Sequence, residues 1–411
     1  MRKLFDPYAQ FVTEKLSSGL EVHYLRKDVP WISLIFCIHT GASNDPVGKE
    51  GTAHFVEHLI AENIPSSCGC TRHALEEIAE RDGGVITFGE TSYFSTSFRL
   101  KLPLTRSLIF NTVSVLGAML LEENFYFGIE EQRRIITHEF LESFGNEVAV
   151  EVTNCWLSNL FQSHWRERSL SILGCRETIK TATQKDLQSF YDRHYAPKNI
   201  SIIGIGGLPV SYLLSLLEKS VFGQQRCGKR NPLRSPLTFP LPPRQNWHIR
   251  EISKYSNVKT DKGFYASRLL LPGTLAQQTV ILIRNMIREK LFRVLREKWG
   301  WVYGVDVNWK YLQDVYEFEI EAHVSFESLQ DQRIHSVMNE SIPGILEQGL
   351  FEYHRRKRIG EICLADSSFG DILQIAMEDI EQRQRILTRK DSIRELEEAS
   401  LYDIESALKF F

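Results

Sequence analysis

Two histidines and a glutamate are closely spaced in the segment Gly51-Thr52-Ala53-His54-Phe55-Val56-Glu57-His58. If this segment is helical, His54 and His58 are about one turn apart and Glu57 lies on the same side, so two imidazoles and a carboxylate converge. Neutral imidazoles are typical zinc ligands, and a carboxylate that does not bind the metal can take a proton from water. The spacing predicts a hydrolytic zinc site with its own base. The alternative is a pair of ordinary buried histidines with Glu57 as their ionic partner.

Further motifs follow in an order that resembles the pitrilysin/insulinase family of zinc peptidases, in particular its short members akin to mitochondrial processing peptidase subunits. The resemblance covers nearly the whole chain and implies a zinc-dependent endopeptidase that hydrolyses short or unfolded peptides, for example in processing a precursor or leader peptide. Besides the first segment, the motifs are Gly83-Gly84 after a predicted helix, Leu173-Gly174, Tyr195-Ala196-Pro197-Lys198-Asn199, and Leu295-Arg296-Glu297-Lys298-Trp299-Gly300-Trp301-Val302-Tyr303.

The third zinc ligand of the family is a glutamate about eighty residues after the second histidine, and Glu139 fits that position best. The segment Ile129–Phe144 has apolar residues at helical spacing, which predicts a helix that carries it. Gln132 occupies the place where the family often has a second, supporting glutamate; an amide can hydrogen-bond a ligand but adds no negative charge. This departure concerns catalytic efficiency more than metal binding. Three competitors for the ligand role lie on the same segment, namely Glu131, His138 and Glu142.

The resemblance also implies roles for residues outside the zinc motif. Arg296 and Tyr303 match a pair that reaches the active site from the second domain, where the phenol stabilises developing negative charge and the guanidinium holds the substrate. Without the resemblance, the preferred interpretation is an arginine solvated at a helix end and a tyrosine packed in a sheet. The strand after Gly83 and Gly84, which includes Thr87, resembles the exposed edge to which the family's substrates add as a further strand.

Composition limits the remaining function classes. The chain has 411 residues, a net charge of −3, 43% hydrophobic residues and 25% charged residues. These values are ordinary for a soluble globular protein and argue against nucleic-acid binding. No apolar run is long enough to span a membrane, and the first residues lack a secretory signal, so we expect a cytoplasmic protein unless a targeting segment was removed. Seven scattered cysteines argue against a disulfide framework. Cys68 and Cys70 with His73 form a weak candidate for a second metal site.

The order of predicted elements indicates an α+β fold with two similar lobes, each a mixed sheet with helices packed on one face. We expect a zinc-binding lobe at 1–221, a Pro-rich linker at 222–248, and a substrate-binding lobe with Arg296 and Tyr303 at 249–411. The family's closed chamber takes four such lobes, so we expect a homodimer or a heterodimer with a related subunit. An alternative function is that of a partner or structural subunit with little activity of its own; such members usually lose the zinc motif, which this chain keeps.

Overall fold

The computed structural model describes nine stretches of the chain. They are residues 6–62, 72–122, 128–144, 172–224, 245–247, 262–312, 315–325, 333–365 and 367–408. Contacts divide these residues into two compact units. The first unit contains the described residues between 6 and 224 together with 367–388, and the second contains those between 245 and 365 together with 389–408. No helix among the described residues combines the length and the apolar character of a membrane span.

The first unit is built on a six-stranded mixed sheet with the strand order β1-β2-β6-β3-β5-β4. β2 and β6 are parallel, and the other neighbouring pairs are antiparallel. In the part of the chain that the structure describes, β4 pairs only with β5 and is therefore an edge strand. The strands are β1 Val12–Lys15, β2 Glu21–Arg26, β3 Trp31–Ile38, β4 Val85–Thr91, β5 Thr96–Pro103 and β6 Ile200–Gly206.

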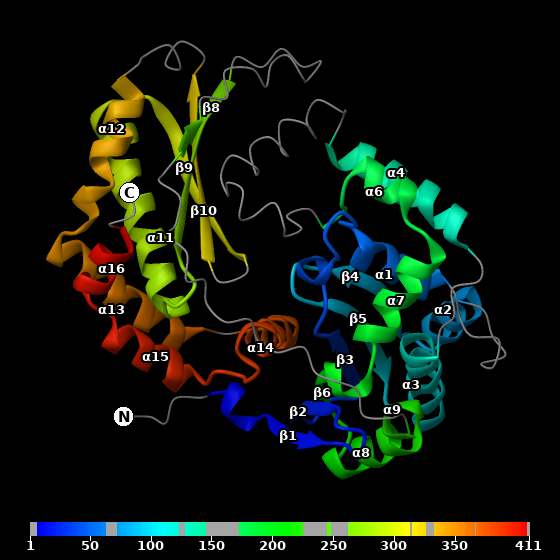
Figure 1. Ribbon diagram of the computed structural model, residues 1–411. Helices are drawn as coiled ribbons and strands as arrows, with labels where there is room; N and C mark the ends of the chain where they lie inside the picture. The colour runs from blue at the N-terminus through cyan, green and yellow to red at the C-terminus, as the bar shows by residue number, and fades with distance from the viewer. Residues whose placement is uncertain are drawn as a thin grey trace. The chain divides into compact units, whose positions relative to one another are not determined.

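Both faces of this sheet are covered, because its central strands are apolar on both sides. Leu34 and Phe36 of β3 point into the main core, while Ile35 and Cys37 point to the opposite face, where α14 packs. Figure 1 shows α14 on one side of the sheet and α1, α3 and α7 on the other. The helices of this unit are α1 Thr52–Glu62, α2 Arg72–Arg81, α3 Arg106–Leu121, α4 Ile129–Phe144, α6 Arg176–Thr181, α7 Gln184–His194, α8 Val210–Lys219, α9 Val221–Gln224 and α14 Phe369–Arg383.

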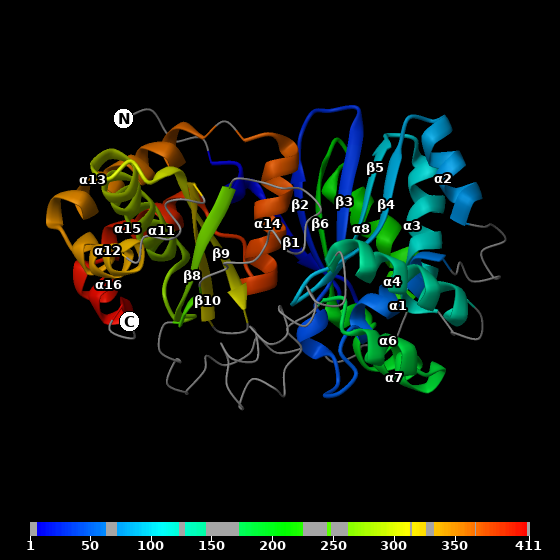
Figure 2. The same cartoon turned by 90° about the horizontal axis from the view of Figure 1, so that it is seen from above.

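The second unit is an antiparallel sheet with the order β7-β8-β10-β9 and with helices on one side, as Figure 2 shows. Buried residues of β9 and β10, such as Val305 and Phe318, share a core with Ile283 and Met286 of α11. A π-helix, Arg293–Lys298, continues α11. The remaining bounds are β7 Gln245–Trp247, β8 Lys262–Pro272, β9 Val302–Leu312, β10 Val315–Ser325, α11 Gln277–Phe292, α12 Arg333–Ser341, α13 Gln348–Leu364, α15 Arg389–Glu398 and α16 Leu401–Leu408.

The predicted α+β class is confirmed, with three differences in detail. α14 covers the second face of the first sheet, although we expected helices on one face only. That helix belongs to the first unit, although the sequence division placed it in the second lobe. Most of the predicted linker 222–248 lies outside the described residues, but its ends are structured: 222–224 belong to α9, where Phe222 is fully buried, and 245–247 form β7. Cys68 and Cys70 also lie outside the described residues, so the second metal site stays a prediction.

Candidate metal centre

The segment with the two histidines is helical, as the spacing predicted. It forms α1, in which His54 and Glu57 are buried and His58 is partly exposed. Phe55, Val56 and the following apolar residues are buried around the rest of the helix. A helix that is covered on nearly all sides has little freedom to rotate, so its polar side chains are held in one direction.

The start of α1 is fixed by a carboxylate and by two glycines. Asp45 accepts hydrogen bonds from the backbone N–H groups of Gly51 and Ala53, both at 2.7 Å. Such bonds satisfy amide groups that a helix leaves without internal partners. Gly51 and Gly174 both have a positive φ, 90° and 74°, and a Cβ on Gly174 would lie 2.1 Å from the carbonyl oxygen of Glu50. These two glycines, each within a motif that carried the resemblance, therefore allow two backbone segments to cross closely.

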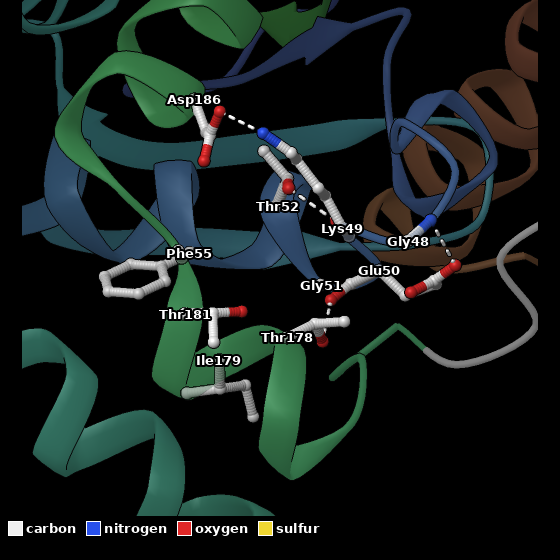
Figure 3. A pocket seen from close by; sticks show the side chains of 11 residues that line it. Gly48, Lys49, Glu50, Gly51, Thr52, Phe55, Thr178, Ile179, Thr181 and Asp186 are labelled. Atoms are coloured by element: carbon white, nitrogen blue, oxygen red, sulfur yellow. Dashed lines mark hydrogen bonds and ion pairs between the residues drawn. The ribbon is translucent and has the colours of Figure 1, made fainter.

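A small cavity of about 60 Å³ lies against this end of α1, and Figure 3 shows its lining. Lys49 forms an ion pair with Asp186 of α7, and the hydroxyl of Thr178 donates to the carbonyl oxygen of Glu50 at 2.6 Å. Neither His54 nor His58 lines the cavity. Its lining groups tie the loop before α1 to α6 and α7, and this connection helps to position the helix.

Among the described residues, one group has the geometry of a metal site, and it consists of His54, His58 and Glu139. The Oε2 atom of Glu139 lies 3.3 Å from Nε2 of His58 and 3.7 Å from Nε2 of His54. In a tetrahedral zinc site with bonds of about 2.0–2.1 Å, neighbouring ligand atoms are about 3.3 Å apart. The donor set and its spacing therefore fit zinc.

Of the four candidates for the third ligand, the structure brings Glu139 to the histidines. Glu139 lies on α4 next to the buried Ile136 and Phe140, which anchor this side of the helix. His138 and Glu142 are exposed and pair with each other at 3.5 Å, and Glu131 is exposed as well.

Gln132 has a defined place beside the candidate metal ligands. Its side-chain oxygen lies 3.1 Å from Nδ1 of His58, and the residue is 3% exposed. When Nδ1 donates its proton to this oxygen, the lone pair of Nε2 is directed at the site shared with Glu139. The amide thus orients the ligand as a carboxylate would, but it adds no charge.

The carboxylate of Glu57 lies between α1 and β4. Its Oε2 is 4.0 Å from Nε2 of His54 and accepts a hydrogen bond from the hydroxyl of Thr91 at 3.2 Å. Gly89 of β4 has φ 74° beside a register shift in the β4–β5 pairing, and a Cβ there would lie 1.8 Å from Oε1 of Glu57. Only glycine lets the strand pass this close to the carboxylate.

Burial dominates the electrostatics of this site. Burial, and then the nearby His58, lower the pKa of His54 to about 3, so this imidazole is neutral and ready to act as a ligand at ordinary pH. Burial raises the pKa of the Tyr195 phenol, and the charge of Glu57 adds to this effect. The side chain of Tyr195, a residue of one of the motifs named above, is therefore uncharged beside Glu57.

The predicted substrate strand corresponds to β4. Gly83 and Gly84 form the turn from α2 into this strand: Gly83 has φ 80°, and a Cβ on Gly84 would lie 2.6 Å from Cδ2 of Leu102. In the structure, these two glycines form the turn at which β4 begins. Thr87 is exposed on β4, where the edge is open among the described residues.

Arg296 and Tyr303 are brought together in the second unit. The guanidinium of Arg296 lies 5.2 Å from the ring centroid of Tyr303 and donates to the carbonyl oxygen of Val302 at 3.2 Å. Tyr303 is 78% exposed at the start of β9, so its hydroxyl is not committed to packing. The packed-sheet alternative for Tyr303 therefore lacks support.

Sequence reasoning missed Asp45, Gly89 and Thr91. An isolated glycine within a strand pattern often marks a bulge or a close backbone approach, so Gly89 carried a usable signal. Asp45 and Thr91 act through contacts between segments that are distant in sequence, and neither has a local signature.

Comparison with known proteins extends this picture. The family model "Peptidase M16 inactive domain" matches residues 181–342, a range that does not include His54, His58 or Glu139. Mitochondrial-processing peptidase subunit beta of Caenorhabditis elegans is 27% identical over 209 residues, which are 49% of this chain and 42% of that protein. The "Probable zinc protease PqqL" of Escherichia coli is 25% identical over 226 residues, 52% of this chain and 23% of that protein. The chain is similar to members of the M16 peptidase family.

Solved M16 structures share the fold of this chain. A "peptidase M16 inactive domain" from Pseudomonas fluorescens has a TM-score of 0.76 at 15% identity and covers 97% of this chain and 94% of its own. Pitrilysin has a TM-score of 0.71 at 15% identity, and the match covers 97% of this chain and 43% of pitrilysin. The predicted family resemblance is therefore confirmed, and this chain spans less than half the length of the two sequence relatives described above.

Proposed function

We propose that this chain is a zinc-dependent endopeptidase that hydrolyses short or unfolded peptides. The observation that carries the proposal is the convergence of His54, His58 and Glu139 beside the buried carboxylate of Glu57. A structural zinc site would use four protein ligands, whereas this group offers three and has a base next to it. Two of the relatives described above are named as a processing peptidase subunit and a probable zinc protease, which supports the same reaction class.

Three residues would hold the metal, and the remaining groups would act on the proton and the substrate. When bound, zinc supplies Lewis-acid activation of a water molecule and of the scissile carbonyl. Glu57 would take the proton from the attacking water and deliver it to the leaving amine. The hydrogen bond from Thr91 holds one carboxylate oxygen of Glu57 in place.

Substrate binding is proposed to use β4 and the second unit. An extended peptide that adds to the open edge of β4, near Thr87, would make main-chain hydrogen bonds and leave sequence choice loose. Tyr303 would donate a hydrogen bond to developing negative charge, and Arg296 would hold the peptide. We further propose that two such chains pair, as a homodimer or as a heterodimer with a related subunit, and that the protein is cytoplasmic.

The proposal is tested by separating metal binding from catalysis. Because Glu57 is a base and not a ligand, we expect Glu57→Gln to retain about one zinc ion per chain and to lose about 10²–10⁴-fold in kcat on a quenched fluorescent peptide. His58→Ala should lose both metal and activity. Metal analysis and peptide hydrolysis measure these two quantities.

Glu139→Gln and Glu142→Gln form a matched pair for the third ligand. Both substitutions remove one carboxylate from α4, but only Glu139 faces the histidines. Zinc retention should fall in the first variant and remain at the wild-type level in the second. A Glu57→Gln protein that cleaves peptides at the wild-type rate would refute the enzyme assignment and favour a non-catalytic subunit.

A further inference from the structure

Two tryptophans form a platform where the π-helix ends, with Trp299 exposed and Trp301 partly buried against the core of the second unit. The rings of Trp299 and Trp301 are stacked, with centroids 4.7 Å apart and an angle of 14° between their planes. Gly300 between them has φ 67°, and the N–H of Trp301 bonds to the carbonyl oxygen of Leu295 at 2.9 Å. The left-handed backbone conformation of Gly300 ends the helix and turns the chain so that both rings lie on one side. Trp299 is 39% exposed, so a large part of its apolar ring is in contact with water, which is unusual for tryptophan.

Two cationic side chains lie over the rings of the platform. Nζ of Lys298 lies 5.6 Å from the ring centroid of Trp299, and the guanidinium of Arg333 lies 5.5 Å from Trp299 and 5.7 Å from Trp301. Arg296 stacks on Tyr303 close by in the sequence. In the described part of the chain, neither Arg296 nor Lys298 forms an ion pair with a carboxylate. A guanidinium that stacks on a ring keeps its in-plane N–H groups available for hydrogen bonds.

We propose that this tryptophan surface, formed by Arg296, Lys298, Trp299, Trp301 and Arg333, binds an acidic segment of the peptide substrate. The inference rests on the proposed function, because Arg296 belongs both to this surface and to the proposed substrate-holding pair. Charge complementarity selects the occupant: carboxylates match the cationic groups of Arg296 and Lys298, and the rings supply apolar contact for neighbouring side chains. π-Helical turns frequently occur at functional sites, which agrees with the position of this surface.

The test uses the full chain with Glu57→Gln, which prevents turnover, and three short fluorescein-labelled peptides that differ only at three positions. One peptide carries glutamates there, the second glutamines and the third lysines. Fluorescence polarisation should give a dissociation constant about tenfold lower for the glutamate peptide than for its glutamine twin, with a preference that declines as salt is raised. The lysine peptide should bind most weakly.

Two variants and a control locate the preference. Lys298→Glu should abolish the preference for glutamate over glutamine, whereas Arg356→Glu should leave it unchanged, since Arg356 is an exposed cation on α13 and the charge change is the same. Trp299→Ala should weaken the binding of the glutamate and glutamine peptides by a few fold, because the apolar platform serves both.

Several outcomes would overturn the inference. Equal binding of the glutamate and glutamine peptides, or an equal loss of preference in Arg356→Glu, would remove the acidic-segment assignment. Tighter binding of oligouridylate than of the glutamate peptide would instead make this a nucleic-acid surface. If Trp299→Ala dissociates a dimer without changing peptide affinity, the surface contacts a second copy of the chain. Because binding is measured without turnover, these results are independent of whether the Glu57 and zinc experiments support hydrolysis.

Discussion

The imidazole of His58 is oriented by an uncharged partner, and this single contact has a measurable consequence. Gln132→Leu keeps a side chain of similar volume but removes the acceptor of the Nδ1 proton of His58. Residue 132 is only 3% exposed, so water does not readily replace that acceptor. Loss of such a contact typically lowers metal affinity about 10–100-fold. We expect a loss of this size in a zinc competition titration.

Gln132→Glu provides the matched comparison. A carboxylate at this position would accept the same hydrogen bond with added charge, so zinc should bind at least as tightly as in the wild type. If Gln132→Leu binds zinc with unchanged affinity, the contact does not orient the ligand.

At the residue scale, the sequence predicted the side chains with a fixed local spacing. His54, Glu57 and His58 share one helix, so their convergence follows from helical geometry. Glu139 lies on a different helix, and its choice over Glu142 needed the family resemblance. The hydrogen bond of Gln132, the approach of Gly89 and the bond from Thr91 join separate elements, and the sequence carries no direct record of such distances.

At the element scale, the start of α1 depends on the ionisation of Asp45. Burial raises the pKa of Asp45 to about 7, against the lowering effect of the hydrogen bonds from Ala53 and Gly51. A folded-state pKa above the ordinary value of 3.8 means that the folded protein holds this proton more tightly than the unfolded chain does. The stabilisation is complete below about pH 4 and declines as the pH rises toward 7, by roughly 1.4 kcal/mol per pH unit at most.

Asp45→Asn should remove this pH dependence. Urea denaturation of the zinc-free proteins measures the free energy of unfolding of each. From pH 4 to pH 7, the free energy of unfolding of the wild type should fall relative to that of the variant. His54, whose lowered pKa causes the opposite trend below pH 6.5, is present in both proteins and cancels in the difference. A difference that is constant with pH would contradict the assignment.

The bend of β4 is the second element on which the site depends. Gly89→Ala would place a Cβ 1.8 Å from Oε1 of Glu57 and would strain a backbone at φ 74°. We expect the strand and the carboxylate to move apart, so peptide hydrolysis should fall at least about tenfold while zinc is retained, because the ligands do not touch this glycine.

Gly48→Ala is the control for backbone strain alone. Gly48 has a similar φ of 76°, but nothing lies within 4 Å of a Cβ at that position. Its substitution should cost stability of about 1 kcal/mol with little effect on kcat. Similar activity losses in the two variants would mean that strain, and not the clash with Glu57, is responsible.

The helix predicted over Ile129–Phe144 from its apolar spacing is present as α4 with the same bounds. Four helices after residue 347 were not predicted. The docking of α14 on the first sheet follows from the apolar second faces of β3 and β6, which the sequence showed only as continuous hydrophobic strands.

At the scale of the whole molecule, the chain has the candidate metal group His54, His58 and Glu139 in its first unit and the Arg296/Tyr303 pair in its second. Solved M16 chains of similar extent exist alongside chains about twice as long. The division into two units could be expected from length and repeated element order. The assignment of residues 367–388 to the first unit could not be expected from the sequence, because it depends on tertiary packing between distant segments.

The proposed homodimer predicts that two inactive variants complement each other. One chain carries Glu57→Gln, and the other carries Arg296→Ala with Tyr303→Phe, so each pure dimer lacks one half of every site. If each site combines the first unit of one chain with the second unit of its partner, random exchange makes half of the dimers mixed, and one of their two sites is intact. An equimolar mixture should therefore recover about one quarter of the wild-type rate. Light scattering that shows an active monomer at all dilutions, or chains that exchange without any recovery, would exclude shared sites; recovery only with a related subunit would favour the heterodimer.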